Sequence, residues 1–380
     1  NVGLVGSEMC IRDRARAVAT TITNYLREEE QATLRRYRIY SMIESGGNVL
    51  TNQSGRGFSW EIQFRQQPVS GNDGETPRNF ARHNLWQTAA LDYRGYQSTD
   101  MLFVREMLEN RGQQALIDVA GRMSTRLQTS IEQKLAAEVY TDGDAPGNEL
   151  RFQGLDSMFG YDGSVDIGTG EKNAAIQAAD RFLWPTDTYA GLSTELGAIA
   201  GSQTTGGSWP DAQCDPEYDF WSSLVVNALS SSFSGTTWEE NCVEAMREGI
   251  HQARRNDTKE AGINLIMLDR RMFIDSLNNL DAKERTIVSR TNGLKSFGFS
   301  DVYEIDGCEV STEYNVPVGC GYGLSTDNIA LHSMQPQIIQ SDGPYFSETN
   351  QAYRYVASVL ANLKFVSPRN FFKIVQETGV

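Results

Sequence analysis

The amino-acid sequence predicts an α+β fold with extended appendages, and three patterns along the chain support this. Residues 58–65 alternate apolar and polar side chains, which is the period of a strand with one buried face. Residues 115–140 carry apolar side chains three or four positions apart, which predicts a long amphipathic helix. After residue 236, predicted helices and strands alternate, whereas the flanking regions do not alternate. This arrangement disfavours a doubly wound enzyme fold.

Residues 1–48 precede these patterns and divide into two parts. Residues 1–14 read as translated sequencing adapter, so we leave them out of the fold prediction. Residues 15–48 are predicted to form an N-terminal arm, because a helical pattern runs from Ala15 to Met42. A helix packed on the chain's own core explains the same pattern equally well, and both interpretations stay open.

Residues 49–98 are predicted to form an extended loop built on a long hairpin. A turn region rich in proline and glycine separates its first arm from a second arm over residues 85–96. Isolated two-stranded hairpins are marginally stable in water, so the apolar face needs a covering surface. Another subunit is one candidate for that surface. The apolar residues of the two arms are Phe58, Trp60, Ile62 and Phe64, followed by Ala89, Leu91 and Tyr93.

The long helix is predicted to begin near residue 113, after an interruption at Asn110-Arg111-Gly112, and to end at Thr141-Asp142-Gly143-Asp144. Residues 151–235 are rich in Gly, Ser, Thr and Asp, which indicates short strands and ordered loops. The expected buried stripe of the helix is Leu116, Ala120, Met123, Leu127, Ile131, Leu135 and Val139.

The region after residue 236 contains the clearest local signals. Thr237 and Glu240 form a capping box that begins a helix. Residues 263–268 are continuously apolar, which is typical of a strand buried on both faces. Asp306-Gly307 is a strong signal for a tight hairpin turn. Further extended stretches are predicted over residues 322–332 and 353–365.

Composition argues against several classes of protein. The formal charge of −15 disfavours a protein whose main task is to bind nucleic-acid phosphates. Since no run of about 18 apolar residues occurs, a membrane span is not expected. None of the five cysteines has a neighbour at the two-residue spacing of zinc or redox motifs. We expect reduced thiols, with a Cys308–Cys320 bridge as the alternative.

No catalytic, cofactor or metal site is predicted. Gly163 and Gly168 have the spacing of a P-loop, but Thr169 stands where the lysine is required. Trp60 and Trp86 could stack a ligand, yet aromatic residues at strand spacing more often pack in a core. The histidines are expected to be structural or surface residues: His83, His251 and His332. An enzyme is therefore not predicted.

The order of these parts resembles the major capsid proteins of tailed bacteriophages, which have the Hong Kong 97-like shell fold. The resemblance covers the chain after residue 14 and depends on the ordered set of elements, because no single piece is diagnostic. The local pieces are Thr186–Leu192, Trp209-Pro210, Gly298-Phe299, Tyr303–Gly307, Asn362–Phe365 and Pro368-Arg369.

The resemblance implies a peripheral domain with a spine helix over residues 99–180, an axial domain over 181–335, and a return to the peripheral domain over 336–380. It implies hexamers and pentamers that build an icosahedral shell around double-stranded DNA, without sequence-specific binding. Scaffolding, portal and decoration proteins are the other partners that it implies. The shell would be assembled in the host cytoplasm and become part of the virion, and no membrane partner is implied.

In such shells the extended loop lies across the neighbouring subunit, which would cover Trp60, Ile62 and Phe64. Some family members form an isopeptide cross-link from a lysine in this loop, but residues 49–98 contain no lysine. We therefore expect noncovalent contacts, with loop arginines pairing with carboxylates of the neighbour. The predicted interface residues are Phe58, Trp60, Ile62, Phe64, Arg65, Arg78, Arg82, Trp86 and Arg94.

Two other functions compete with this interpretation. An encapsulin-type compartment has the same shell fold and encloses enzymes instead of a genome. A soluble α+β hydrolase whose site is not recognised belongs to a different class, and it would remain small in solution where a shell protein forms large assemblies.

Overall fold

The computed structural model of the 380-residue chain divides into two compact units. Of the described residues, unit 1 holds Gly95–Leu135 and Gln335–Leu360, and unit 2 holds the remainder. The structure describes residues 37–45, 47–64, 67, 71, 80, 82–109, 113–159, 181–184, 187–195, 197–198, 220–254, 262–281 and 302–376.

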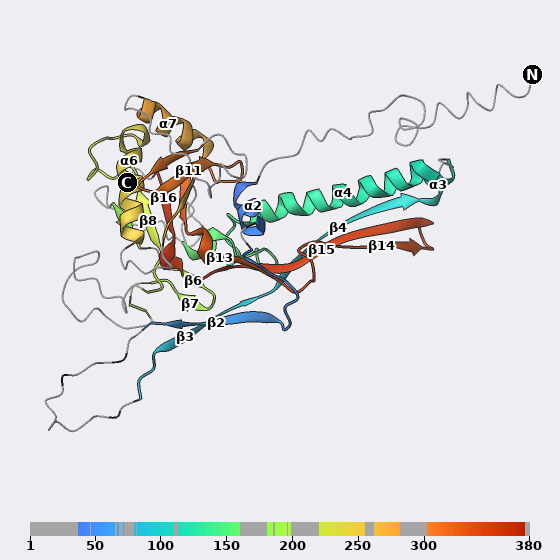
Figure 1. Ribbon diagram of the computed structural model, residues 1–380, viewed down its shortest axis with the longest axis horizontal. Coiled ribbons are helices and arrows are strands. Elements are labelled where there is room, and N and C mark those ends of the chain that lie inside the picture. The colour runs from blue at the N-terminus through green and yellow to red at the C-terminus, as the bar shows by residue number, and fades with distance from the viewer. Residues whose placement is uncertain are drawn as a thin grey trace, which may run out of the picture. The chain divides into compact units, whose positions relative to one another are not determined.

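The core of unit 2 is a mixed sheet of seven strands in the order β10-β11-β9-β12-β16-β8-β5. Figure 1 labels β8, β11 and β16 of this sheet. β9 runs parallel to β11 and β8 runs parallel to β16, whereas the other pairs are antiparallel. This mixture confirms the predicted α+β class. The strands are β5 Phe182–Leu183, β8 Leu224–Asn227, β9 Leu265–Leu268, β10 Tyr303–Ile305, β11 Cys308–Thr312, β12 Cys320–Leu324 and β16 Phe372–Val375.

Helix α6, Trp238–Ala253, packs on β8 and β16, and α7, Arg270–Asp281, packs beside α6. The predicted capping box is confirmed, because the Thr237 side chain accepts from the Glu240 amide and the Glu240 side chain accepts from the Thr237 amide. The Asp306-Gly307 turn is confirmed as well, with φ of 47° and 83° at its two residues. The capping box and the turn depend only on residues close together in sequence, so they could be predicted without knowledge of the fold.

The ring of Phe372 lies between a helix and a strand that both present glycine to it. A Cβ at Gly249 of α6 would approach the ring to 2.5 Å, and a Cβ at Gly323 of β12 would approach it to 2.0 Å. Both distances are below the van der Waals contact of two carbon atoms. The fully buried Phe372 therefore requires glycine on both sides.

The N-terminal part of the described chain packs against a smaller group of elements in unit 2. Ile39 and Ile43 of α2 are buried, and the amide of Arg38 donates to Glu313 at 2.7 Å. For residues 38–45 the helix thus packs on the chain's own core, and residues 15–36 lie outside the described residues. The elements are α2 Arg38–Ser45, β1 Val49–Leu50, β6 Thr188–Tyr189, β7 Leu192–Ser193, β13 Ile329–Ser333 and the short 3-10 helices η2 Leu155–Met158, η4 Thr326–Asn328 and η5 Pro368–Asn370.

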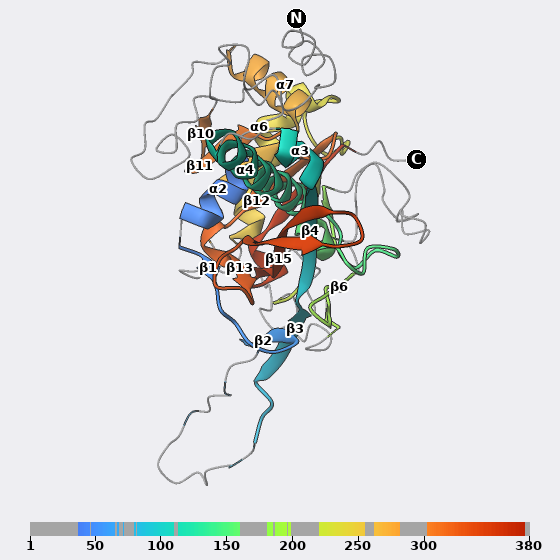
Figure 2. The ribbon, with the colours of Figure 1, turned by 90° about the vertical axis from the view of Figure 1, so that its right-hand side faces the viewer.

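Unit 1 contains the long helix α4, Gln113–Glu138, which lies along one face of a sheet (Figures 1 and 2). Its residues Met123, Leu127, Ile131 and Leu135 are buried, as predicted. α3 ends at Glu109 and α4 begins at Gln113, in agreement with the predicted interruption. This sheet has five strands, of which β14 Gln340–Ser347 and most of β4 Arg94–Phe103 and β15 Ala352–Phe365 belong to unit 1, with β4 and β14 both pairing with β15. The helix before α4 is α3 Val104–Glu109.

Three expectations are corrected. The strand predicted over residues 85–96 divides at Tyr93 into β3, Trp86–Asp92, and β4. The stretch over residues 322–332 divides into β12 and β13, because η4 interrupts it. The Cys308–Cys320 bridge is wrong, since both thiols are free. Among the described residues, no helix is long and apolar enough to cross a membrane.

Gly323→Ala should destabilise the protein by about 1–3 kcal/mol, because the added methyl group must displace the buried ring of Phe372. Gly121→Ala is the matched control. The exposed Gly121 of α4 has no neighbour within 4 Å of the position that a methyl group would occupy, so alanine should stabilise the helix by up to about 1 kcal/mol. Urea-induced unfolding of both variants checks the difference. Equal stability of Gly323→Ala and wild type would contradict the packing.

Candidate subunit interface

The predicted hairpin is a two-stranded ribbon of β2, Gly57–Gln63, and β3. Trp60 pairs with Ala89, and Gln63 pairs with Trp86. Because directly paired residues share a face, Trp60 lies on the face that includes the buried Ala89, whereas Trp86 lies on the opposite, exposed face. The two tryptophans therefore do not form a stacking pair for a ligand.

The inward face of the ribbon lies on the chain's own unit 2. The ring of Phe58 stacks on the imidazole of His332, with 4.2 Å between centroids and 11° between planes. The indole Nε1 of Trp60 donates to the carbonyl oxygen of Val366 at 3.1 Å, and Nζ of Lys364 lies 5.0 Å from the Trp60 ring centroid. This set of contacts, which we call the aromatic mount, attaches the base of the ribbon to the end of β15 and the residue that follows it.

Further contacts extend this attachment along both strands. Phe64 is buried against Phe220, with 5.6 Å between ring centroids. The side-chain amide of Asn362 donates to the carbonyl oxygen of Asp92 at 2.8 Å, and the amide of Ala90 donates to Ala190 at 3.0 Å. The chain itself therefore covers part of this face, and contact of Trp60, Ile62 and Phe64 with a neighbouring subunit stays a prediction.

The outward face and the far end of the hairpin remain candidates for contact with another molecule. Trp86 is 49% exposed and Phe80 is 89% exposed. Arg82 is exposed, and Ile62 on the inward face is half-buried. Arg65 and Arg78 lie outside the described residues. The exposed aromatic residues with Arg82 have the composition that is enriched at protein interfaces.

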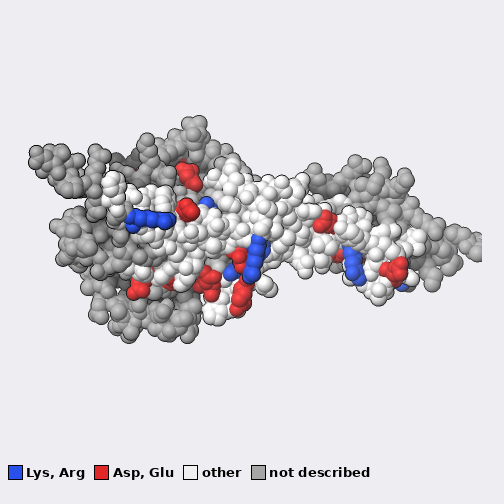
Figure 3. All heavy atoms as spheres, turned by 90° about the horizontal axis from the view of Figure 1, so that it is seen from below, with Lys and Arg blue, Asp and Glu red and all other residues white. Residues whose placement is uncertain are grey.

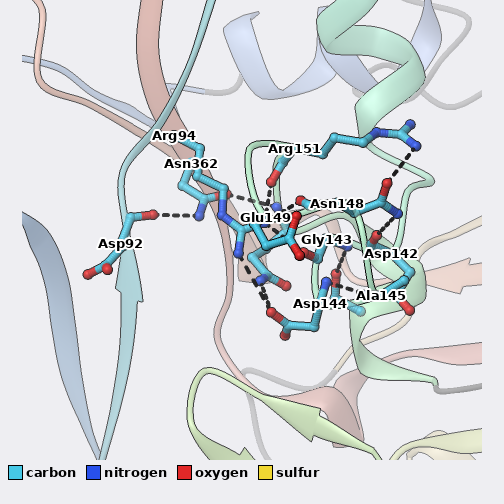
Figure 4. A network of polar contacts seen from close by, with 12 residues as sticks. Asp92, Arg94, Asp142, Gly143, Asp144, Ala145, Asn148, Glu149, Arg151 and Asn362 are labelled. Atoms are coloured by element: carbon cyan, nitrogen blue, oxygen red, sulfur yellow. Dashed lines mark hydrogen bonds and ion pairs between the residues drawn. The ribbon is translucent and has the colours of Figure 1, made fainter.

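Arg94 does not belong to this outward surface, contrary to expectation. Its Nη1 atom donates to the carbonyl oxygens of Gly143 at 2.7 Å and Asn148 at 3.2 Å, and also to that of Arg151 (Figure 4). Its Nη2 atom lies 3.7 Å from a carboxylate oxygen of Asp144, and only 17% of the side chain is exposed. Arg94 thus holds the loop that follows α4 and is not available to a neighbour's carboxylates.

His332 was predicted to be structural, and its contacts agree with that role. Burial, with a smaller effect of nearby Lys364, lowers the pKa of His332 from 6.5 to about 4. The imidazole is therefore neutral at pH 7, which allows it to stack on Phe58 without placing a second positive charge near Lys364. The roles of His332 and Lys364 in the mount, and of Asn362 beside it, were not predicted, because no local pattern links these residues to a ribbon about 270 to 300 positions earlier.

A second exposed apolar surface lies in unit 1, on the face of the sheet opposite α4. Tyr96 of β4 contacts Lys134 of α4, with 5.6 Å from Nζ to the ring centroid, so residues at odd positions of β4 face away from the helix. Leu360 lies against Gly95 on that outer face, and Tyr345 is paired with Arg354 on it. The large exposed residues of this sheet face are Met101 (41%), Phe103 (44%), Tyr345 (58%) and Leu360 (44%).

This exposed sheet face was not predicted from the sequence. The alternation of Gln97, Thr99, Met101 and Phe103 with the residues between them is a usable signal. It indicates a strand, but it does not tell which of the two faces the long helix covers. The partner strands lie about 240 to 265 positions later in the chain, so only the fold brings the four apolar residues together.

Comparison with known proteins identifies this architecture. No protein-family model matches the chain, and a search of curated proteins finds no match. Among solved structures, the chain is similar to the cyanophage A-1(L) capsid asymmetric unit, with a TM-score of 0.61, 15% identity, and coverage of 95% of this chain and 98% of that chain. A native GTA particle capsid gives a TM-score of 0.52 and 9% identity, with 95% and 98% coverage.

The capsid of cyanophage P-SCSP1u is also similar, with a TM-score of 0.50, 11% identity, and coverage of 97% of this chain and 96% of that chain. These likenesses extend over almost the whole length of each chain. The protein therefore has the Hong Kong 97-like fold of phage capsid proteins, which confirms the predicted fold class.

Phe58→Ala should release the base of the hairpin, because it removes the ring that stacks on His332. The expected loss is about 2 kcal/mol of local stability, since the ring is half-buried. Hydrogen exchange should accelerate in residues 57–63 and 86–92 and stay unchanged in α6. Phe80→Ala is the control, because Phe80 is 89% exposed and contributes little to the mount. Equal protection of the ribbon in wild type and Phe58→Ala would contradict the mount.

Acidification should weaken the same attachment. Folded His332 binds a proton only near pH 4, whereas the unfolded chain binds it near pH 6.5. The stability that neutral His332 contributes is complete above about pH 6.5 and is lost as the pH falls toward about 4. The unfolding free energy of wild type should therefore fall more steeply over this range than that of His332→Gln. Parallel pH curves for the two proteins would show that His332 does not titrate as the geometry requires.

Proposed function

We propose that this chain is a major capsid protein that assembles into the icosahedral head shell of a tailed phage. The observation that carries the proposal is the combination of the capsid fold with a ribbon whose outward face and far end expose Trp86 and Phe80. A large apolar side chain on an exposed ribbon is stabilised when a second surface removes it from water. The fold supports the class of protein, and the exposed ribbon supports this choice of contact surface.

The outer sheet face of unit 1 is the surface that fits this ribbon. It offers Met101, Phe103, Tyr345 and Leu360, all more than 40% exposed, to the aromatic residues of another copy. Such a contact joins two different surfaces of the same chain, so it is heterologous and closes into rings when the rotation between copies is suitable. Hexamers and pentamers of this kind build the proposed shell.

The charge of the chain suits a container for double-stranded DNA better than a DNA-binding protein. The net charge is −15, and acidic and basic side chains of the described residues are interspersed on the face in Figure 3. A weakly repulsive wall leaves the enclosed duplex free to enter and leave.

In this proposal the shell is part of the virion and is assembled in the host cytoplasm. Scaffolding, portal and decoration proteins are its other partners, and the predicted domain limits at residues 49, 99, 181 and 336 belong to the same proposal.

The purified chain should form rings or closed particles that size-exclusion chromatography and electron microscopy detect. The double variant Phe80→Glu/Trp86→Glu should reduce assembly at least tenfold, because two charges replace the apolar contact. Burying these charges costs several kcal/mol, and about 1.4 kcal/mol corresponds to a tenfold change in affinity. Leu150→Glu is the matched control, since Leu150 is 79% exposed but lies on neither surface. Circular dichroism should show the same folded content in all three proteins.

Mixing separates this contact from a general loss of solubility. A sheet-face variant, Met101→Glu/Leu360→Glu, should also fail to assemble alone. When it is mixed with the ribbon variant, each pair of copies keeps one intact ribbon and one intact sheet face, so heterodimers should form without growing into rings. Assembled wild-type particles should dissociate to single chains on boiling in detergent and reductant, because the loop has no lysine. A wild-type chain that stays monomeric at every concentration would overturn the proposal.

A further inference from the structure

The interior of unit 2 contains a lysine and an aspartate that face each other away from water. Lys373 lies on the central strand β16, and its side chain has no exposed surface. Its Nζ atom is 2.8 Å from Oδ1 of Asp156, which lies in η2 and is itself buried. Lysine and aspartate are rarely buried as completely as this, because removing two charges from water is costly.

A tyrosine completes the cluster. The hydroxyl of Tyr322 donates to the same Oδ1 atom at 2.8 Å, and Nζ of Lys373 lies 5.4 Å from the centroid of the Tyr322 ring. The rings of Tyr140 and Phe159 pack against the Tyr322 ring, with 5.4 and 6.2 Å between ring centroids. Burial and the adjacent Asp156 raise the pKa of Tyr322, so the phenol keeps its proton and remains a donor.

The backbone around Asp156 holds this arrangement in place. A Cβ at Gly154 would come within 2.3 Å of the carbonyl oxygen of Glu138, so the chain passes η2 in close contact with the end of α4. The hydroxyl of Ser157 accepts from the amide of Gly143 at 2.8 Å, and the amide of Leu155 donates to Val139 at 2.7 Å. The carboxylate therefore has a fixed position against Nζ, as an intramolecular reaction requires.

We propose that Lys373 and Asp156 are joined by an intramolecular isopeptide bond, which makes this buried pair a site of self-catalysed covalent modification. The proposal is independent of the assembly proposed above, because both residues belong to one copy. It concerns the inside of the subunit and not a contact between subunits.

The bond forms by loss of one water molecule. One proton first passes from the Lys373 ammonium group to the Asp156 carboxylate, which leaves a neutral amine and a carboxylic acid. Nζ then attacks Cγ, a bond from Nζ to Cγ forms, and the bond from Cγ to Oδ2 breaks. A second proton from nitrogen leaves with the departing hydroxyl as water, so the pair becomes a neutral amide and water, with no oxidant or other reactant. The Tyr322 hydroxyl lies on Oδ1, where negative charge develops as the tetrahedral intermediate forms.

The surroundings favour the product over the ion pair. The amide carries no charge, so it removes the desolvation penalty that a buried lysine and aspartate impose. Its oxygen still accepts the hydrogen bond from Tyr322. Because the fold already holds the two groups together, the reaction avoids the entropy loss of a bimolecular encounter. The link would also connect positions 217 residues apart, which restricts the unfolded chain strongly.

Intact-mass measurement of the purified wild-type chain, denatured and reduced, tests the bond directly. We expect a mass lower than that of the sequence by one water molecule. Trypsin does not cut after an acylated lysine, so digestion should yield a branched peptide that joins residues 152–172 to residues 370–380. A wild-type mass equal to that of the unmodified sequence, with free peptide 374–380 after digestion, would overturn the proposal.

Variants distinguish the bond from other dehydrations, such as succinimide formation at an aspartate. Lys373→Arg keeps the positive charge and Lys373→Met keeps the apolar length, and both should restore the full mass. Lys364→Arg is the matched control, because Lys364 is a half-buried lysine beside Trp60, and it should keep the deficit of one water. If the deficit persists in Lys373→Arg, the water is lost elsewhere and the proposal fails.

Discussion

A two-stranded ribbon is not stable by itself in water, and this constraint explains how the extended hairpin is built. One of its faces must be covered before the other can serve a partner. The chain covers the inward face itself, with Phe58 on His332 and the indole of Trp60 bonded to Val366. In the proposed assembly the ribbon is therefore positioned before a second copy binds, which lowers the entropy lost on association. The exposed residues Trp86 and Phe80 are the ones proposed to contact that copy.

The sequence predicted the helices, strands and turns more completely than it predicted which surfaces of the chain they pack against. The period of two in β2, the capping box of α6 and the turn at Asp306 are local patterns, and each was found where expected. The mount was not foreseen, because alternation shows that a face is buried but not which surface covers it. The charge of Arg94 suggested an acidic partner, yet its main acceptors are backbone carbonyl oxygens, which no residue type in the sequence reveals.

The sheet of unit 1 favours association through its face and not through its edge. Among the described residues, β14 pairs with β15 alone, so it forms an edge of this part of the sheet. Pro344 of β14 has no amide donor, and the register of the strand shifts between Asp342 and Tyr345. Both features hinder strand addition, a common protection of exposed edges. The four large exposed apolar side chains on the adjoining face are the surface proposed for contact between copies.

The proposed contacts between copies and the proposed bond within a copy differ in a way that suits assembly. Apolar contacts of moderate area dissociate and re-form, so a misplaced subunit can leave a growing ring before it is trapped. A covalent link between copies would remove that correction, and residues 49–98 offer no lysine for one. Inside a copy no such correction is needed, so a permanent link is compatible with assembly. The pair Lys373–Asp156 joins β16 to η2 at the end of α4. The proposed bond would fix these two elements of unit 2 relative to each other without any contact between copies.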